Sequence, residues 1–259
     1  TTDSLLVVCN KKSEAAYLLV HTRSSEYRSF HLSAAMCLQH RRDVLSELQS
    51  TLTQGKKVLC IATQVIEAGV DISFGAVLRL TAGMDSIVQA AGRCNRNGES
   101  ETPCPVYAVN CTDEKLGMLR DIQRGKDAAL ALMNAFGASP ERFGSSLFSD
   151  ASIQYYYSAL YRDMAAGEQD YYIPDQKATL LDLMALNEKY ADERCADASF
   201  FFLRQAFKTA GQYFSVFDED TTDILVPYGD GRRLVAELCS ERCQYDVSCR
   251  AAVLKQITV

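Results

Sequence analysis

The amino-acid sequence predicts an α/β fold: a parallel sheet lobe with helices on both faces, followed by a helical linker and a small α+β C-terminal domain. Three observations support this prediction. Short apolar runs rich in β-branched residues alternate with helix-like segments over residues 1–112. Helix-like segments then follow one another over residues 113–192 without strand-like runs between them. Residues 193–259 mix the two patterns, which indicates a separate accessory domain.

The first domain is expected to hold five strands, each a short apolar run bounded by polar or turn-forming residues: residues 4–10, 29–34, 57–63, 76–82 and 105–110. The first two connections are expected to be helices, at residues 11–23 and 35–52. In the second helix, Leu45, Leu48 and Leu52 recur at helical spacing. Strands joined by helices are typical of a parallel sheet buried on both faces, and ligands of such sheets lie at the carboxyl ends of the strands.

The linker is expected to contain three helices, at residues 113–136, 152–166 and 178–191. The C-terminal domain is expected to contain a helix from residue 199, two strands at 213–218 and 224–228, and a helix that opens at residues 229–233. Tyr155, Tyr156 and Tyr157 form an aromatic run that could stack bases. Because consecutive residues of a helix point in different directions, packing of these rings in the core or between lobes is favoured.

Composition restricts the function classes. The chain has 259 residues, of which 47% are apolar and 23% charged, and a formal net charge of -6. A broad phosphate-binding surface is usually basic, so any contact with nucleic acid must be local. The apolar runs are too short to cross a bilayer, and the N-terminus shows no signal peptide, so a cytoplasmic location is expected. The sequence does not begin with methionine, so we expect it to be a piece of a longer protein.

The ten cysteines are expected to be small buried side chains and reduced thiols, because the chain is large and has no secretory signal. No CxxC pair occurs. Cys239, Cys243 and Cys249 lie close together, but the three histidines are far away in sequence, so a zinc site there is disfavoured and no metal ligands are assigned.

Polar residues follow the third expected strand in the segment VLCIATQVIEAGVDI, residues 58–72. The strand delivers Thr63 at its carboxyl end, and Glu67, Gly69 and Asp71 follow in a short turn. Small residues allow a backbone to approach a phosphate or sugar, while the hydroxyl and carboxylate groups supply hydrogen bonds. The alternative is a purely structural corner with Asp71 as a capping residue.

A second polar segment, SIVQAAGRCNRNGE, spans residues 86–99. Gln89, Gly92, Arg93 and Arg96 stand at offsets 0, 3, 4 and 7, which is one face if the segment is helical. Two guanidinium groups on one face repel each other unless an anion binds between them. The alternative is a solvated face with surface ion pairs, which contribute little to stability.

Together these two segments resemble motifs V and VI of a superfamily 2 helicase, which lie in the second of its two RecA-like lobes. They are most similar to the CRISPR-associated helicase–nuclease of type I systems. LLVVCNKKSEA (5–15) resembles motif IV, and HLSAAMCLQHR (31–41) resembles the segment that follows it. AFKTAGQYFSVFDEDTTDILVPYGDG (206–231) resembles the C-terminal domain of that family. The resemblance is dense over residues 1–112, thin over 113–190 and recovers over about 198–238.

The resemblance implies a role for each matching residue. Arg93 and Arg96 would be arginine fingers for the γ-phosphate of ATP, with Gln89 fixing or coupling the nucleotide. The remaining residues fall into three groups: nucleotide-binding Gly69, Asp71 and Gly92; DNA-backbone-binding Thr63, Ser33 and Arg41; and Glu67 as a coupling residue.

The resemblance also implies groups that the sequence lacks. It contains no P-loop pattern GxxxxGK[ST] and no histidine followed by aspartate, which the nuclease of the family requires. ATP and Mg²⁺ would therefore be held mainly by another lobe, and this chain alone is predicted to be inactive. The implied partners are single-stranded DNA, the CRISPR effector complex, the N-terminal helicase lobe and the nuclease domain. Two alternatives remain open: a non-catalytic module that binds the effector complex or an inhibitor, and the equivalent half of a helicase acting on RNA.

Overall fold

The computed structural model describes seven parts of the chain: residues 2–22, 24–67, 69–162, 164, 170–187, 204–214 and 224–257. The chain forms two compact units. The first contains Thr1–Tyr156 and Ile224–Val259, and the second contains Tyr157–Asp223. The boundaries expected at residues 112 and 192 remain predictions.

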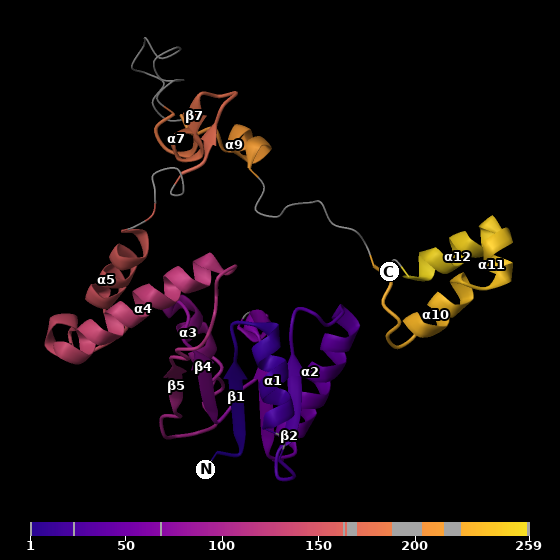
Figure 1. Cartoon of the computed structure of the whole chain (residues 1–259), viewed down its shortest axis with the longest axis horizontal. Helices are drawn as coiled ribbons and strands as arrows, with labels where there is room; N and C mark the ends of the chain where they lie inside the picture. Colours follow the sequence, from indigo (N-terminus) through magenta and orange to yellow (C-terminus); the bar gives the residue numbers. More distant parts are fainter. Residues whose placement is uncertain are drawn as a thin grey trace. The chain divides into compact units, whose positions relative to one another are not determined.

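The first unit is built on a five-stranded sheet in the order β2-β3-β1-β4-β5, with all neighbouring strands parallel (Figure 1). Its strands are β1 (Ser4–Val8), β2 (Arg28–Leu32), β3 (Val58–Ala62), β4 (Ala76–Leu80) and β5 (Val106–Val109). Four of them lie within the runs predicted from the sequence, and β2 begins one residue before its predicted run, at Arg28. The predicted parallel sheet is therefore confirmed.

Helices cover both faces of this sheet. Along β1, Leu6 belongs to a core cluster that includes Leu48 of helix α2 (Leu38–Thr53). The next residue, Val7, belongs to a second cluster with Ala15 of helix α1 (Lys12–His21). Because successive residues of a strand point to opposite faces, the two clusters form two separate layers. The α/β fold class predicted from the sequence is confirmed.

The chain after β4 forms α3 (Met84–Ala91), and α4 (Arg120–Ala138) packs against it. A Cβ atom on Gly125 of α4 would lie 3.0 Å from the Cα atom of Gly83, so the two backbones approach closely. The 3-10 helix η2 (Pro140–Phe143) and helix α5 (Asp150–Tyr161) follow. None of the helices among the described residues is long and apolar enough to span a membrane.

The tyrosines of α5 have different environments. Tyr156 is buried, and its hydroxyl group donates a hydrogen bond to Asp85 Oδ1 over 3.1 Å. The Tyr155 ring packs edge-on against the Phe143 ring, with 5.6 Å between the ring centres. Tyr157 is exposed. Packing, the favoured interpretation of this run, therefore applies to Tyr155 and Tyr156.

The second unit is small. Strands β6 (Tyr172–Ile173) and β7 (Ala178–Thr179) pair antiparallel, and helices α7 (Leu180–Met184) and α9 (Phe207–Tyr213) pack with them around Ile173, Ala178, Leu183 and Ala210. The helix expected over residues 178–191 is thus wrong at its start, because residues 178–179 are a strand and Thr179 caps a helix that ends at Met184. Most of the strand expected at 213–218 lies outside the described residues.

The C-terminal segment forms three short helices, α10 (Gly231–Leu238), α11 (Glu241–Tyr245) and α12 (Val247–Ile257), around the buried residues Leu234, Cys243 and Val253. Residues 224–228, expected to be a strand, have no regular secondary structure.

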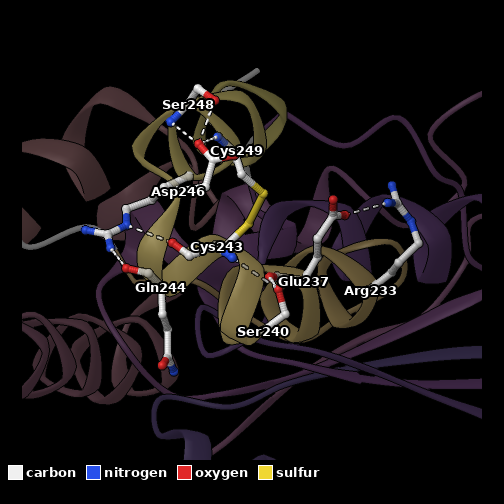
Figure 2. The surroundings of a disulfide bond; sticks show 9 residues. Arg233, Glu237, Ser240, Cys243, Gln244, Asp246, Ser248 and Cys249 are labelled. Atoms are coloured by element: carbon white, nitrogen blue, oxygen red, sulfur yellow. Dashed lines mark hydrogen bonds and ion pairs between the residues drawn. A yellow bond between two sulfur atoms is a disulfide. The ribbon is translucent and has the colours of Figure 1, made fainter.

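A disulfide bond between Cys243 and Cys249 joins α11 to α12 (Figure 2). The Ser240 hydroxyl group caps α11, and the Asp246 carboxylate accepts hydrogen bonds from the backbone amides of Ser248 and Cys249. The expectation that the cysteines are all reduced is wrong for this pair. The two thiols come together because the tight connection at Asp246 folds α12 back onto α11.

Candidate functional site

The segment after β3 forms a tight turn at the carboxyl end of the sheet. Thr63 is extended and precedes the 3-10 helix η1 (Gln64–Ile66), and we call residues 63–67 the motif V turn. Gly69 follows with a φ angle of +71°, in the left-handed region that other residues rarely adopt. The glycine at this position therefore allows the chain to reverse toward Asp71 and β4.

Arg93 is bound to the motif V turn. Its Nε atom donates a hydrogen bond to the carbonyl oxygen of Ile66 over 3.0 Å, and its Nη2 atom donates one to the carbonyl oxygen of Glu67 over 2.6 Å. The residue is only 5% exposed. Its Nη1 atom is buried and has no hydrogen-bond partner among the described residues. Burial, together with the nearby Arg96 charge, lowers the pKa of the Arg93 guanidinium.

Arg96 has a different environment, at the surface. Its side chain is 40% exposed, and its Nε atom lies 2.7 Å from Oδ1 of Asp71, whose side chain is 79% exposed. A cavity of about 440 Å³ is lined by Asp71, Asn95 and Asn97, among other residues. Exposed ion pairs of this kind contribute about 0–1 kcal/mol, so the pair can separate at little cost.

The helix that carries Gln89 ends before the two arginines. Helix α3 stops at Ala91, and Gly92 is its C-cap. Asn95 has a φ angle of 47°, and Phe74 forms an isolated parallel bridge with Cys94. The single helical face inferred from the spacing of these residues is therefore not formed beyond Gly92. Gln89 and Gly92 are exposed at the end of α3, while the arginines lie in the loop that follows.

The Glu67 side chain points into the protein and pairs with Arg79 of β4. The distance from Arg79 Nε to Glu67 Oε1 is 2.9 Å, and the side chains are 0% and 5% exposed respectively. Burial raises the pKa of Glu67, and the Arg79 charge partly offsets this effect. Burial likewise lowers the pKa of Arg79. Sequence reasoning missed Arg79, although an arginine inside the apolar run AVLRLTA was a signal of a buried polar contact.

Two of the residues predicted to contact DNA lie together. Leu32 pairs with Ala62 in the β2–β3 ladder, so Ser33 and Thr63 follow at the same edge of the sheet. Both are largely buried, at 2% and 7% exposure. Arg41 lies on α2, where its Nη2 atom donates a hydrogen bond to the Met36 carbonyl oxygen over 3.4 Å.

Lys12 is a residue at this edge that the sequence prediction did not include. It is the exposed first residue of α1 and lines a cavity of about 560 Å³ together with Asn10, Ser13, Thr63 and Gln64, among others. The amino end of a helix favours anions because its first backbone N–H groups have no partner in the helix. The signal in the sequence was the pair of lysines directly after the first apolar run.

No metal centre is found in the part of the chain that the structure describes: no group of three or more His, Cys, Asp or Glu side chains is arranged to hold an ion. The charged groups suited to a small ligand are instead guanidinium groups. Their planar forks match the geometry of phosphate oxygens.

Comparison with known proteins finds similarity over the first part of the chain. Residues 1–99 match the family model for "CRISPR-associated nuclease/helicase Cas3, C-terminal". A protein of Haloferax volcanii named "CRISPR-associated nuclease/helicase Cas3" is 45% identical over 84 residues, which is 32% of this chain and 8% of that protein. The chain therefore spans a small part of the curated relative that it matches.

The solved structures that the chain matches include the ADP complex of T. fusca Cas3, with 15% identity and a TM-score of 0.48 over 62% of this chain and 20% of that one. A chain of a "CRISPR RNA-guided surveillance complex, pre-nicking" matches with 16% identity and a TM-score of 0.44 over 62% of this chain and 22% of that one. The resemblance predicted from the motifs is confirmed by the family model and the curated relative: residues 1–99 are similar to the C-terminal region of CRISPR-associated nuclease/helicases.

Proposed function

We propose that this chain is the C-terminal part of an ATP-dependent helicase–nuclease that translocates on single-stranded DNA and degrades target DNA in type I CRISPR interference. In this proposal the P-loop lobe and the His-Asp nuclease lie in other parts of the complete protein. The observation that carries the proposal is the arrangement of Arg93 and Arg96 beside the motif V turn.

The two arginines suit a polyphosphate ligand. When bound with Mg²⁺, ATP supplies the γ-phosphoryl group whose hydrolysis drives translocation. Arg93 is held by two backbone carbonyl groups, and its Nη1 atom is buried without a partner among the described residues. Arg96 is held only by weak surface contacts. These features support a division of roles, in which Arg93 is preorganised and Arg96 leaves Asp71 to reach the phosphate when the lobes close.

The carboxyl edge of the sheet is the proposed DNA-binding face. Lys12 offers a positive charge and the helix amino end offers backbone N–H groups, while Thr63 borders the same cavity. These groups contact phosphate oxygens, which positions a strand without reading its sequence. The CRISPR effector complex is the proposed partner that delivers this strand.

The test is ATP turnover by the complete enzyme, with this chain joined to its P-loop lobe, in the variants Arg93→Lys and Arg96→Lys. Lysine keeps the charge but cannot bond two carbonyl groups or two phosphate oxygens with one planar fork. We expect kcat to fall on the order of 10³-fold in each variant, while the affinity for ATP changes far less.

Arg233→Lys is the matched control, because Arg233 forms an exposed ion pair with Glu237 in α10. We expect it to retain normal turnover. The proposed role of either arginine is wrong if its lysine variant keeps more than about a tenth of the normal kcat at saturating ATP and DNA, a loss of about 1.4 kcal/mol or less.

A further inference from the structure

A network of buried polar side chains, which we call the polar network, crosses the carboxyl end of the sheet. It starts with the ion pair of Glu67 and Arg79. Arg79 Nη1 donates a hydrogen bond to Asn10 Oδ1 over 2.7 Å, and Asn10 Nδ2 donates one to Glu114 Oε1 over 2.8 Å. Glu114 Oε2 in turn accepts a hydrogen bond from Lys126 Nζ over 2.9 Å. The polar network therefore runs from the motif V turn, through β4 and the end of β1, to helix α4.

These groups are buried and their charges balance. The side chains of Arg79 and Glu114 are 0% exposed, and those of Glu67 and Lys126 are 5% and 7% exposed. The two carboxylates neutralise the two cations. Buried ion pairs are often no more stabilising than apolar residues of similar volume, so stability alone does not require this arrangement. The hydrogen bonds and ion pairs of such a polar network do, however, restrict its members to one geometry.

At its Glu67 end, the polar network holds the backbone that orients Arg93. Arg79 holds the Glu67 carboxylate, while the carbonyl oxygen of the same glutamate accepts the hydrogen bond from Arg93 Nη2. The neighbouring carbonyl of Ile66 accepts the bond from Arg93 Nε. A displacement of the Glu67 backbone would therefore move the carbonyl groups that orient Arg93.

We propose that Arg79 is a positioning residue: through Glu67 it fixes the motif V turn and hence the Arg93 guanidinium, and through Asn10 and Glu114 it ties both to Lys126 of α4. Helix α4 thereby acts as the fixed support of Arg93. The benefit to nucleotide chemistry rests on the function proposed above, whereas the positioning itself is a property of this chain.

The test measures hydrogen exchange of the Arg93 Nε–H group by ¹H–¹⁵N NMR in the full chain without nucleotide. Single substitutions would leave a buried charge unpaired and endanger folding. The variants are therefore charge-balanced pairs: Arg79→Met with Glu67→Gln, and Lys126→Met with Glu114→Gln. The control pair is Lys57→Met with Glu26→Gln, which removes an exposed ion pair beside the same sheet.

We expect Arg93 Nε–H exchange to accelerate about tenfold in the Arg79 variant and about threefold in the Lys126 variant, as expected from the loss of one or part of one hydrogen bond. The control should match the wild type, and backbone amides of the sheet should stay protected in all three proteins. The proposal is overturned if Arg93 exchange in either test variant remains within about twofold of the wild type while the sheet is intact.

This readout also separates the two proposals. It needs neither ATP nor a second lobe, so failure of the proposed function would appear as normal turnover of the Arg93→Lys enzyme and would leave the exchange result unchanged. Failure of the positioning role would appear in the exchange rates alone.

Discussion

At the residue scale, the buried thiol of Cys60 leads to a prediction about how the free energy of unfolding depends on pH. Burial in the centre of β3 raises its pKa to about 12, from an ordinary value of 9.0. A pKa that is higher in the folded than in the unfolded state contributes stability that is complete below pH 9 and is lost as the pH rises toward 12. The free energy of unfolding should therefore fall with rising pH in this window, by up to about 1.4 kcal/mol per pH unit for this thiol.

Cys60→Ala tests this by chemical denaturation at about pH 8 and about pH 10.5, on either side of the ordinary thiol pKa. Alanine does not titrate, so the variant should lose less stability between the two pH values than the wild type does, whatever its stability at the lower one. Cys111→Ala is the control, because Cys111 is exposed. A wild-type slope equal to that of Cys60→Ala would show that the buried thiol does not carry this effect.

Individual side chains were the least predictable part of the site. Thr63, Glu67 and Arg93 could be selected from the sequence, because they belong to segments that resemble helicase motifs V and VI. The burial of Arg93 could not be predicted, because it depends on two carbonyl groups in a turn that is distant in sequence. Arg79 was missed because its side-chain partners, Glu67 and Asn10, come from two separate segments, and no periodic pattern links them.

At the element scale, two glycines of α4 should respond in opposite ways to alanine. Gly137 has open space where a Cβ atom would lie. Gly125→Ala, by contrast, would place its Cβ atom 3.0 Å from the Gly83 Cα atom and 3.1 Å from the Gly83 nitrogen. We expect Gly137→Ala to stabilise the protein by up to about 1 kcal/mol through helix propensity. Gly125→Ala should destabilise it by about 1–3 kcal/mol, because backbone cannot move aside as a side chain does.

Thermal or urea unfolding of the two variants measures this difference within one helix, so each is the control of the other. Equal stabilisation by both would show that α3 and α4 do not approach as closely as the structure indicates.

The success of the element predictions depended on the length of each pattern. The strands of the large sheet were confirmed because each is a run of apolar residues between polar turns. Strands β6 and β7 have two residues each, which is too short for a periodic signal. The expected strand at 224–228 failed for the opposite reason: its sequence is apolar, but no described strand pairs with it. Instead, the Tyr228 hydroxyl group donates a hydrogen bond to Asp43 of α2 over 2.9 Å.

At the scale of the whole molecule, the chain should not hydrolyse ATP by itself. Its arginines can contact a phosphate, but the sequence has no P-loop pattern to hold the nucleotide. We expect no turnover above background in a phosphate-release assay with the purified chain, with or without single-stranded DNA. Turnover that persists after repeated purification, at micromolar concentrations of the chain, would contradict the proposal that half of the ATP site lies elsewhere.

The net charge of the chain leads to a prediction about DNA binding. With a formal net charge of -6, the protein has no long-range attraction for a polyanion, so binding depends on a few local contacts. Each phosphate neutralised on a single strand contributes about -0.7 to the slope of log affinity against log salt concentration. Two or three contacts at the edge near Lys12 and Thr63 therefore predict weak binding and a slope of about -2. Fluorescence anisotropy with a labelled oligonucleotide at several salt concentrations measures both quantities.

Lys12→Met should then reduce the steepness of this slope by about 0.7, because it removes one cation from the proposed DNA-binding face. Lys57→Met is the matched control, since Lys57 is paired with Glu26 at the opposite, amino end of the strands, and it should leave the slope unchanged. If Lys12→Met and Lys57→Met have the same slope as the wild type, the DNA does not bind at the end of α1. If the wild type binds tightly with a slope steeper than about -5, many more phosphates are contacted than this edge can reach, and a second basic surface must exist.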